Sequence, residues 1–221
     1  MPPLDVSLAF FIASIVLALA PGPDNIFVLT QSALYGWKQG LSVTVGLCTG
    51  LLLHTALDAC GVAALILASP LLFSTLKTIG ALYLLYLAWG ALRAGKAVQT
   101  VPAGNASPGL DTSHTPSLSL SRLYRRGIIM NVTNPKVSVF FLAFLPQFTR
   151  PEHGSLVGQI LWLGMLFILA TICIFGGIAI LAGKLGARLQ QSTRMQRWLN
   201  WLASAIFTAL ALHLLLSHAG G

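Results

Sequence analysis

The chain has 221 residues, of which 56% are hydrophobic and only 8% are charged, and its mean hydropathy is +0.81. Soluble domains carry about 25% charged residues, so this composition excludes an ordinary soluble domain and indicates an integral membrane protein. The formal net charge of +8 would suit a nucleic-acid partner in a soluble protein. We expect no nucleic acid here, because basic residues gather in the cytoplasmic loops of membrane proteins and the sequence has no basic, aromatic-interleaved module.

Six apolar stretches are predicted to cross the lipid bilayer, which takes about twenty residues each. They cover residues 6–34, 40–69, 77–93, 127–149, 155–183 and 198–216, and the third is the shortest. No Lys or Arg precedes the first stretch, so we interpret it as a retained span and not as a cleaved secretory signal. The expected fold class is therefore an all-α integral membrane protein with six transmembrane helices.

One sizeable polar segment, residues 94–126, is rich in Ser, Thr, Pro and Gly and has basic ends. We interpret it as a flexible linker, which the positive-inside rule places in the cytoplasm. With the linker in the cytoplasm, ten of the thirteen Lys and Arg lie on the cytoplasmic side, only Lys77 and Arg150 lie outside, and Lys136 lies within a span. Three spans on each side of the linker then place both termini in the periplasm. The chain then divides into a three-helix repeat (1–93), the linker, and a second three-helix repeat (127–221).

The two repeats are inverted relative to each other, because the first begins outside and the second inside. Inverted repeats are common in secondary transporters, and paired Pro or Gly interruptions mark their binding sites. The interruptions here are Pro21, Gly22, Pro23, Asp24 and Asn25 in the first span, and Asn131, Asn134, Pro135 and Lys136 in the fourth. A rise of about 1.5 Å per residue puts Asp24 and Lys136 at similar depths near the middle of the membrane.

Asp24 and Lys136 allow two interpretations. A charge inside a span costs about 2.5–3.5 kcal/mol on insertion scales, so such residues usually mark function. In the first interpretation the two side chains form a pair that only locks the two halves together. In the second, Asp24 binds a ligand ammonium group or a proton, while Lys136 and backbone donors freed by the break bind a carboxylate.

The second span carries Gly46, Gly50, His54 and Asp58 at four-residue intervals, hence along one helix face. We interpret the glycines as packing residues, which permit contact within the chain and equally permit a homodimer. His54 and Asp58 are interpreted either as a proton relay or as members of an interhelical hydrogen bond.

No enzyme signature, cofactor site or metal site is expected, because the sequence has no nucleophile elbow, phosphate-binding loop or paired metal motif. Cys48, Cys60 and Cys173 lie in apolar stretches and are expected to be small core residues. The linker is too short to supply a nucleotide-binding domain, so transport would draw on an ion gradient. A passive channel for small solutes is the alternative, and a membrane enzyme is a more distant one.

Three segments carry a family resemblance: APGPDNIFVLTQSALYGWKQGLSVTVGLCTG, GALYLLYLAWGALRAG and RRGIIMNVTNPKVSVFFLAFLPQF. They closely resemble the LysE/RhtB family of bacterial amino-acid exporters, for which the PGP and NPK motifs together are highly specific. The resemblance implies a six-helix inner-membrane protein that exports amino acids or their derivatives by proton antiport, nearest to the homoserine/threonine branch. The family motifs correspond to Pro21 to Asp24 and to Asn134 to Lys136.

Overall fold

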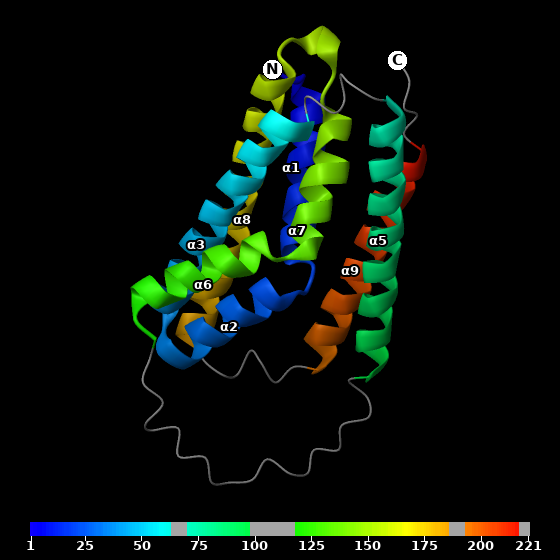
Figure 1. Cartoon of the computed structure of the whole chain (residues 1–221). Coiled ribbons are helices and arrows are strands. Elements are labelled where there is room, and N and C mark those ends of the chain that lie inside the picture. Colours follow the sequence, from blue (N-terminus) through cyan, green and yellow to red (C-terminus); the bar gives the residue numbers. More distant parts are fainter. Residues whose placement is uncertain (63–69, 98–117, 186–192, 217–221) are drawn as a thin grey trace.

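The computed structural model of the chain describes residues 1–62, 70–97, 118–185 and 193–216, and these residues form helices and connecting turns without a strand among them (Figure 1). The helices are α1 (Leu4–Leu19), α2 (Pro23–Tyr35), α3 (Trp37–Leu57), α5 (Pro70–Ala97), α6 (Leu120–Val132), α7 (Pro135–Val139), α8 (Leu156–Leu185) and α9 (Thr193–Leu216). Two π-helical turns, η1 (Asp58–Val62) and η3 (Phe140–Phe144), extend α3 and α7, and two 3-10 turns, η4 (Leu145–Phe148) and η5 (Pro151–His153), follow η3.

Three helical stretches are long and apolar enough to cross a membrane by themselves: 37–61, 74–93 and 156–184. Two bent helix pairs raise the number to five if each pair is one span: α1 with α2, bent by 63°, and α6 with α7 and the turns after it, bent by 49°. The apolar part of α9, Asn200–Leu216, is shorter than the other spans. The described residues therefore support an all-helical membrane protein with three to five candidate spans.

Helix α5, which contains the expected third span, differs from the sequence prediction in its bounds. It runs from Pro70 to Ala97 and so starts earlier and ends later than the expected span 77–93, while its membrane-spanning stretch, 74–93, is shorter than the stretches 37–61 and 156–184. Lys77, expected in an outside loop, lies within this helix with its side chain buried. Residues 70–75, PLLFST, are apolar enough to belong to the helix, so the prediction of a loop between residues 69 and 77 is wrong.

The expected linker is also partly helical, since α6 begins at Leu120. Leu123 of this helix is fully buried, and the guanidinium of Arg126 lies 4.6 Å from the centre of the Phe27 ring on α2. These contacts stabilise a helical start that the polar composition of the segment does not predict. The middle of the expected linker, 98–117, lies outside the described residues.

The helices pack in two groups that share a phenylalanine-rich core. Figure 1 shows α5 and α9 side by side at one edge, while α3 packs against α6 and α8, and α1 against α8. Between the groups, Phe140 of η3 lies 4.8 Å from Phe144, 5.1 Å from Phe167 of α8 and 5.8 Å from Phe10 of α1, measured between ring centres. This aromatic cluster joins the first and second halves of the chain next to the two helix bends.

The outer surface of the helices is apolar, as expected of a surface in contact with lipid. Leu52 and Leu57 of α3 and Leu169 of α8 are about half exposed in the isolated chain. Cys60 and Cys173 are exposed on the same kind of surface, so the expectation that all three cysteines are core residues is wrong for these two. Apolar stretches in a membrane protein face lipid as often as protein, and hydropathy does not separate the two.

The face of α3 that carries Gly46 and Gly50 packs against α6 of the same chain. A Cβ at Gly46 would overlap the carbonyl oxygen of Tyr124 and lie 3.0 Å from the Cα of Gly127 on α6. A Cβ at Gly50 would lie 2.7 Å from the Oδ1 of Asn131. The packing interpretation of these glycines is therefore confirmed, and the face they form is covered by α6 and not left open for a second copy of the chain.

We expect Gly46→Ala to destabilise the protein by about 1–3 kcal/mol, because the added methyl group has to push α3 away from α6. Gly177→Ala on α8 is the matched control, since a Cβ there meets nothing within 4 Å. The control should be neutral or stabilising by about 0.5–1 kcal/mol, the usual gain of Ala over Gly in a helix. Thermal unfolding of both variants in detergent measures the effect, and equal Tm values would contradict the close crossing.

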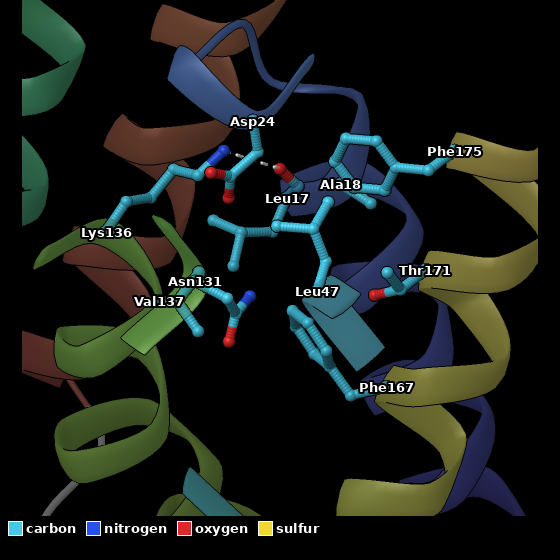
Figure 2. Close-up of a pocket in the computed structure, with 10 residues that line it drawn as sticks. All are labelled: Leu17, Ala18, Asp24, Leu47, Asn131, Lys136, Val137, Phe167, Thr171 and Phe175. Atoms are coloured by element: carbon cyan, nitrogen blue, oxygen red, sulfur yellow. Dashed lines mark hydrogen bonds between the residues drawn. The ribbon is translucent and has the colours of Figure 1, made fainter. Parts of the chain in front are cut away.

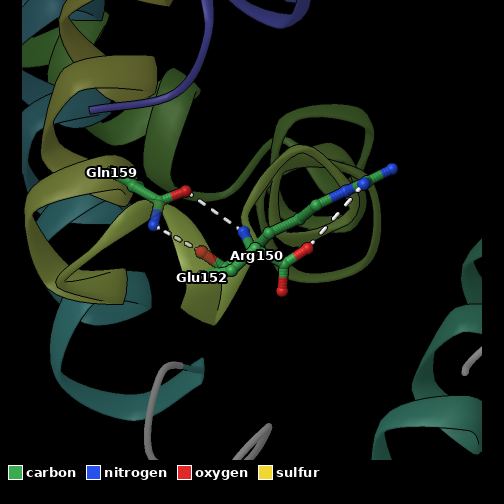
Figure 3. Close-up of polar contacts among 3 residues, drawn as sticks. All are labelled: Arg150, Glu152 and Gln159. Atoms are coloured by element: carbon green, nitrogen blue, oxygen red, sulfur yellow. Dashed lines mark hydrogen bonds and ion pairs between the residues drawn. The ribbon is translucent and has the colours of Figure 1, made fainter. Parts of the chain in front are cut away.

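A buried glutamine organises the loop that leads into α8 (Figure 3). The side chain of Gln159 donates from Nε2 to the carbonyl oxygens of Arg150 at 2.8 Å and Gly154 at 3.1 Å, and its Oε1 accepts from the backbone N–H of Arg150 at 3.1 Å. These bonds satisfy backbone groups that the turn leaves without helical partners. The nearby ion pair between Arg150 and Glu152, 3.8 Å long, is exposed and contributes little stability.

Candidate functional site

The helix of the expected first span is broken between α1 and α2. Pro21 and Pro23 lack a backbone N–H, so α1 ends at Leu19 and α2 starts with Pro23 at its first position. Gly22 between them has extended backbone, and Asn25 closes part of the gap by donating from Nδ2 to the carbonyl oxygen of Ala18 at 2.7 Å. The break leaves the last carbonyls of α1 without helical partners, and it places Asp24 in the first turn of α2.

The helix of the expected fourth span is broken in the same way between α6 and α7. Asn134 caps α7: its Oδ1 accepts from the backbone N–H of Lys136 at 3.0 Å, and Pro135 occupies the first helical position. In both breaks a charged residue directly follows the proline that opens the second half-helix. Asp24 has this position in α2 and Lys136 has it in α7.

The two breaks face each other, and each is stabilised by the other. Asn134 donates from Nδ2 to Oδ2 of Asp24 at 2.6 Å, while the ammonium group of Lys136 donates to the carbonyl oxygens of Ala20 at 3.1 Å and Leu17 at 3.4 Å. Lys136 thus lies at the carboxyl end of α1, where the helix dipole favours a cation, and Asp24 lies at the amino end of α2, where it favours an anion.

Asp24 and Lys136 come together as the depth count predicts, but they are not directly paired. Among the described residues no ion pair joins them, and the recorded partners of the lysine are carbonyl oxygens of α1. Both side chains are almost fully buried, with exposed fractions of 3% and 6%. Each charge is held by neutral groups of the opposite break, and whether the two residues lock the halves together or bind a substrate stays open.

A pocket lies beside these two charges (Figure 2), and its lining combines polar side chains with a larger apolar wall. It is lined by Leu17, Ala18, Asp24, Leu47, Asn131, Lys136, Val137, Phe167, Thr171 and Phe175. Three buried oxygens of this lining have no hydrogen-bond partner within the described part of the chain: Oδ1 of Asp24, Oδ1 of Asn131 and Oγ1 of Thr171. In this conformation the pocket has room for about one water molecule.

His54 and Asp58 lie one helical turn apart where α3 ends. The Nε2 of His54 lies 3.4 Å from the carbonyl oxygen of Asn131 on α6, and its ring packs at 5.5 Å from that of Phe141. Asp58 begins the π-helical turn η1, is buried, and its Oδ2 has no partner among the described residues. The contact of His54 matches the interhelical hydrogen bond that was one of the two interpretations. The proton relay between His54 and Asp58 stays a prediction.

Sequence reasoning missed the wall of the pocket that α8 provides. Phe167, Thr171 and Phe175 follow one another at four-residue intervals on this helix and line the pocket together. The run from Leu166 to Phe175 is apolar apart from Thr171, and a single threonine in such a run carries little signal. Its spacing relative to the two phenylalanines is the one feature that could have pointed to this helix face.

Comparison with known proteins agrees with the resemblance seen in the sequence. The family model described as LysE type translocator matches residues 15–218. The chain is 32% identical over 188 residues to a protein of Salmonella typhimurium named homoserine/homoserine lactone efflux protein, covering 85% of each chain. It is 33% identical over 165 residues to a protein of Salmonella choleraesuis named leucine efflux protein, covering 73% of this chain and 69% of the relative.

A further relative from Vibrio cholerae, described as an uncharacterized membrane protein, is 31% identical over 204 residues, which cover 92% of this chain and 93% of the relative. No solved structure matches the chain. The family match covers both breaks and all residues that line the pocket. The chain therefore belongs to the LysE family of membrane translocators.

Proposed function

We propose that this protein is a secondary transporter that exports neutral amino acids or their derivatives across the bacterial inner membrane. The observation that carries the proposal is the pocket between the two helix breaks, where a buried carboxylate with a free oxygen lies beside a buried ammonium group. The ammonium group of a substrate would bind Asp24, and its carboxylate would bind Lys136. The efflux proteins to which the chain is similar are named for homoserine and leucine, and both of these are neutral amino acids.

The charge inventory of the pocket favours neutral over basic substrates. Asp24 is the one acidic residue in the lining, and the substrate's own ammonium group would occupy it. A lysine or arginine side chain would bring a second positive charge toward an apolar wall and toward Lys136, at a high desolvation cost. The proposed substrate is therefore a small amino acid whose side chain is uncharged.

The proposed topology is six spans in two inverted three-helix repeats, 1–93 and 127–221, with the linker 94–126 in the cytoplasm and both termini in the periplasm. The matching breaks in the first and fourth spans support it, as does Figure 1, in which α1 begins and α9 ends at the same end of the bundle. Because the pocket has room for about one water molecule here, transport requires the halves to separate alternately toward each side of the membrane.

The proposed energy source is the proton gradient. Asp24 would exchange a proton for the substrate's ammonium group, because one carboxylate cannot hold both, and this competition produces antiport. Asp58 is a second candidate for proton binding, since it is buried with a carboxylate oxygen that has no described partner. His54 is proposed as a positioning residue that holds α3 against α6 at Asn131.

An export assay tests this function. Cells that overexpress the protein should survive inhibitory concentrations of one or more neutral amino acids, including homoserine and leucine, and should hold smaller intracellular pools of them than cells with an empty vector. Lysine should give no such relief. A proton uncoupler should abolish export, and Asp58→Asn should weaken its dependence on the gradient if that residue takes part in coupling. Flux that ignores the uncoupler and does not saturate would indicate a passive channel.

A further inference from the structure

Thr171 is a buried polar residue on the apolar wall of the pocket. Its side chain is 2% exposed, and its hydroxyl has no hydrogen-bond partner among the described residues. Figure 2 shows it between Phe167 and Phe175 on α8, across the pocket from Lys136 and Asn131. The hydroxyl is therefore available at the side of the pocket opposite the lysine.

The free hydroxyl of Thr171 is unusual within this chain. Serine and threonine hydroxyls in membrane helices commonly bond to the carbonyl oxygen one turn back, because lipid offers no other partner. Thr44 does so to Gly40 at 2.9 Å, Thr55 to Leu51 at 2.8 Å, Ser14 to Phe10 at 2.8 Å and Ser32 to Val28 at 2.7 Å. Thr171 is buried as deeply as these residues and has no such bond, so its hydrogen-bonding capacity is left for another group.

The placement of the charges decides which part of a substrate meets Thr171. Asp24 and Lys136 would hold the ammonium and carboxylate groups that every amino acid carries. The side chain of the substrate then extends toward the opposite wall, which is made of Phe167, Thr171 and Phe175. The two phenylalanines would pack against its carbon atoms, and one polar atom on a short side chain would lie beside the threonine hydroxyl.

We propose that Thr171 is a specificity-determining residue that recognises a hydroxyl group on the substrate's side chain, so that hydroxylated neutral amino acids such as homoserine or threonine are preferred over apolar amino acids of the same size. The proposal rests on the export function proposed above. A single neutral hydrogen bond of this kind should change the preference by about three- to tenfold.

The test compares substrates of equal size that differ in the hydroxyl group. Everted membrane vesicles take up each radiolabelled amino acid in turn, and its unlabelled counterpart competes. Homoserine and norvaline form the first pair, and threonine and valine form the second. Thr171→Val removes the hydroxyl and keeps the shape, whereas Thr171→Ser keeps the hydroxyl. Thr55→Val is the control, because Thr55 is similarly buried on α3 and does not line the pocket.

The wild-type protein, the Ser variant and the control should each prefer the hydroxylated member of a pair by about three- to tenfold. The Val variant should lose this preference while it still transports the apolar member at an undiminished rate. An unchanged preference in Thr171→Val, or its loss in Thr171→Ser, would overturn the role of Thr171 alone. Absence of transport of all four amino acids by the wild-type protein would overturn the export function itself, and this inference with it.

Discussion

Asp24→Asn is expected to lower the rate of amino-acid export about ten- to a hundredfold while the protein still accumulates in the membrane. Asparagine has the same shape as aspartate, and its amide oxygen can still accept the bond that Asn134 donates at 2.6 Å. The variant loses the negative charge, and a hydrogen bond to a charged group is worth about 1.5–3 kcal/mol. It also loses the group proposed to exchange a proton for the substrate.

Asp5→Asn is the matched control for this prediction, because Asp5 is an exposed acidic residue in the first turn of α1 and lies outside the pocket. Export rates, divided by the amount of protein in the membrane, should be normal for the control. The stability of Asp24→Asn should fall less than that of Lys136→Met, since Lys136 keeps its bonds to Leu17 and Ala20 at the carboxyl end of α1. Normal export by Asp24→Asn at normal expression would rule out Asp24 as the substrate-binding carboxylate.

Lys136→Met is expected to abolish export and also to destabilise the protein by about 3 kcal/mol. Methionine has a similar length but donates no hydrogen bonds, so the carbonyl oxygens of Leu17 and Ala20 lose the partner that Lys136 provides. The charge of Asp24 is then left buried without a neighbouring positive charge. Unfolding in detergent measures the loss of stability, and Lys38→Met, at an exposed lysine of α3, is the matched control.

The double variant Asp24→Asn with Lys136→Met separates a structural role of the two charges from a role in binding. Removing both charges takes away the uncompensated carboxylate, so stability should recover in part relative to Lys136→Met alone. Export should not recover, because neither end of a zwitterionic substrate then has a charged partner. Recovery of export together with stability would mean that the two residues only hold the breaks together.

Hydropathy and the positions of the prolines were sufficient to predict the helical membrane fold and the two helix breaks of the candidate site. Pro21 and Pro23, and Pro135 in the second half, open their helices through a local covalent property that acts in any surroundings. The rise of a helix is equally general, which is why counting residues brought Asp24 and Lys136 to one pocket. Family membership also followed from short motifs, since the residues of both breaks are contiguous in the chain.

The partners of those residues depended on tertiary packing. Lys136 bonds to the carbonyl oxygens that α1 exposes at its end, and this choice depends on how the two breaks meet in space. Asp58 follows His54 by four residues, and its backbone N–H bonds to the carbonyl oxygen of His54 as in a regular α-helix. The contact of the His54 ring comes from another helix, since its Nε2 lies 3.4 Å from the carbonyl oxygen of Asn131 on α6. Local sequence rules place the two side chains on one helix face but do not say which group of a neighbouring helix reaches them.

The wall of the pocket was the part least accessible to sequence reasoning. Thr171 and its neighbouring phenylalanines belong to a helix that is apolar on nearly all sides, so hydropathy does not distinguish the face that lines the pocket from the face in contact with lipid. The same ambiguity misplaced Cys60 and Cys173. The local sequence is sufficient to predict which segments enter the membrane and where a helix is broken, because both depend on the chemistry of neighbouring residues. Which apolar side chains surround a ligand is decided only when distant helices pack against one another.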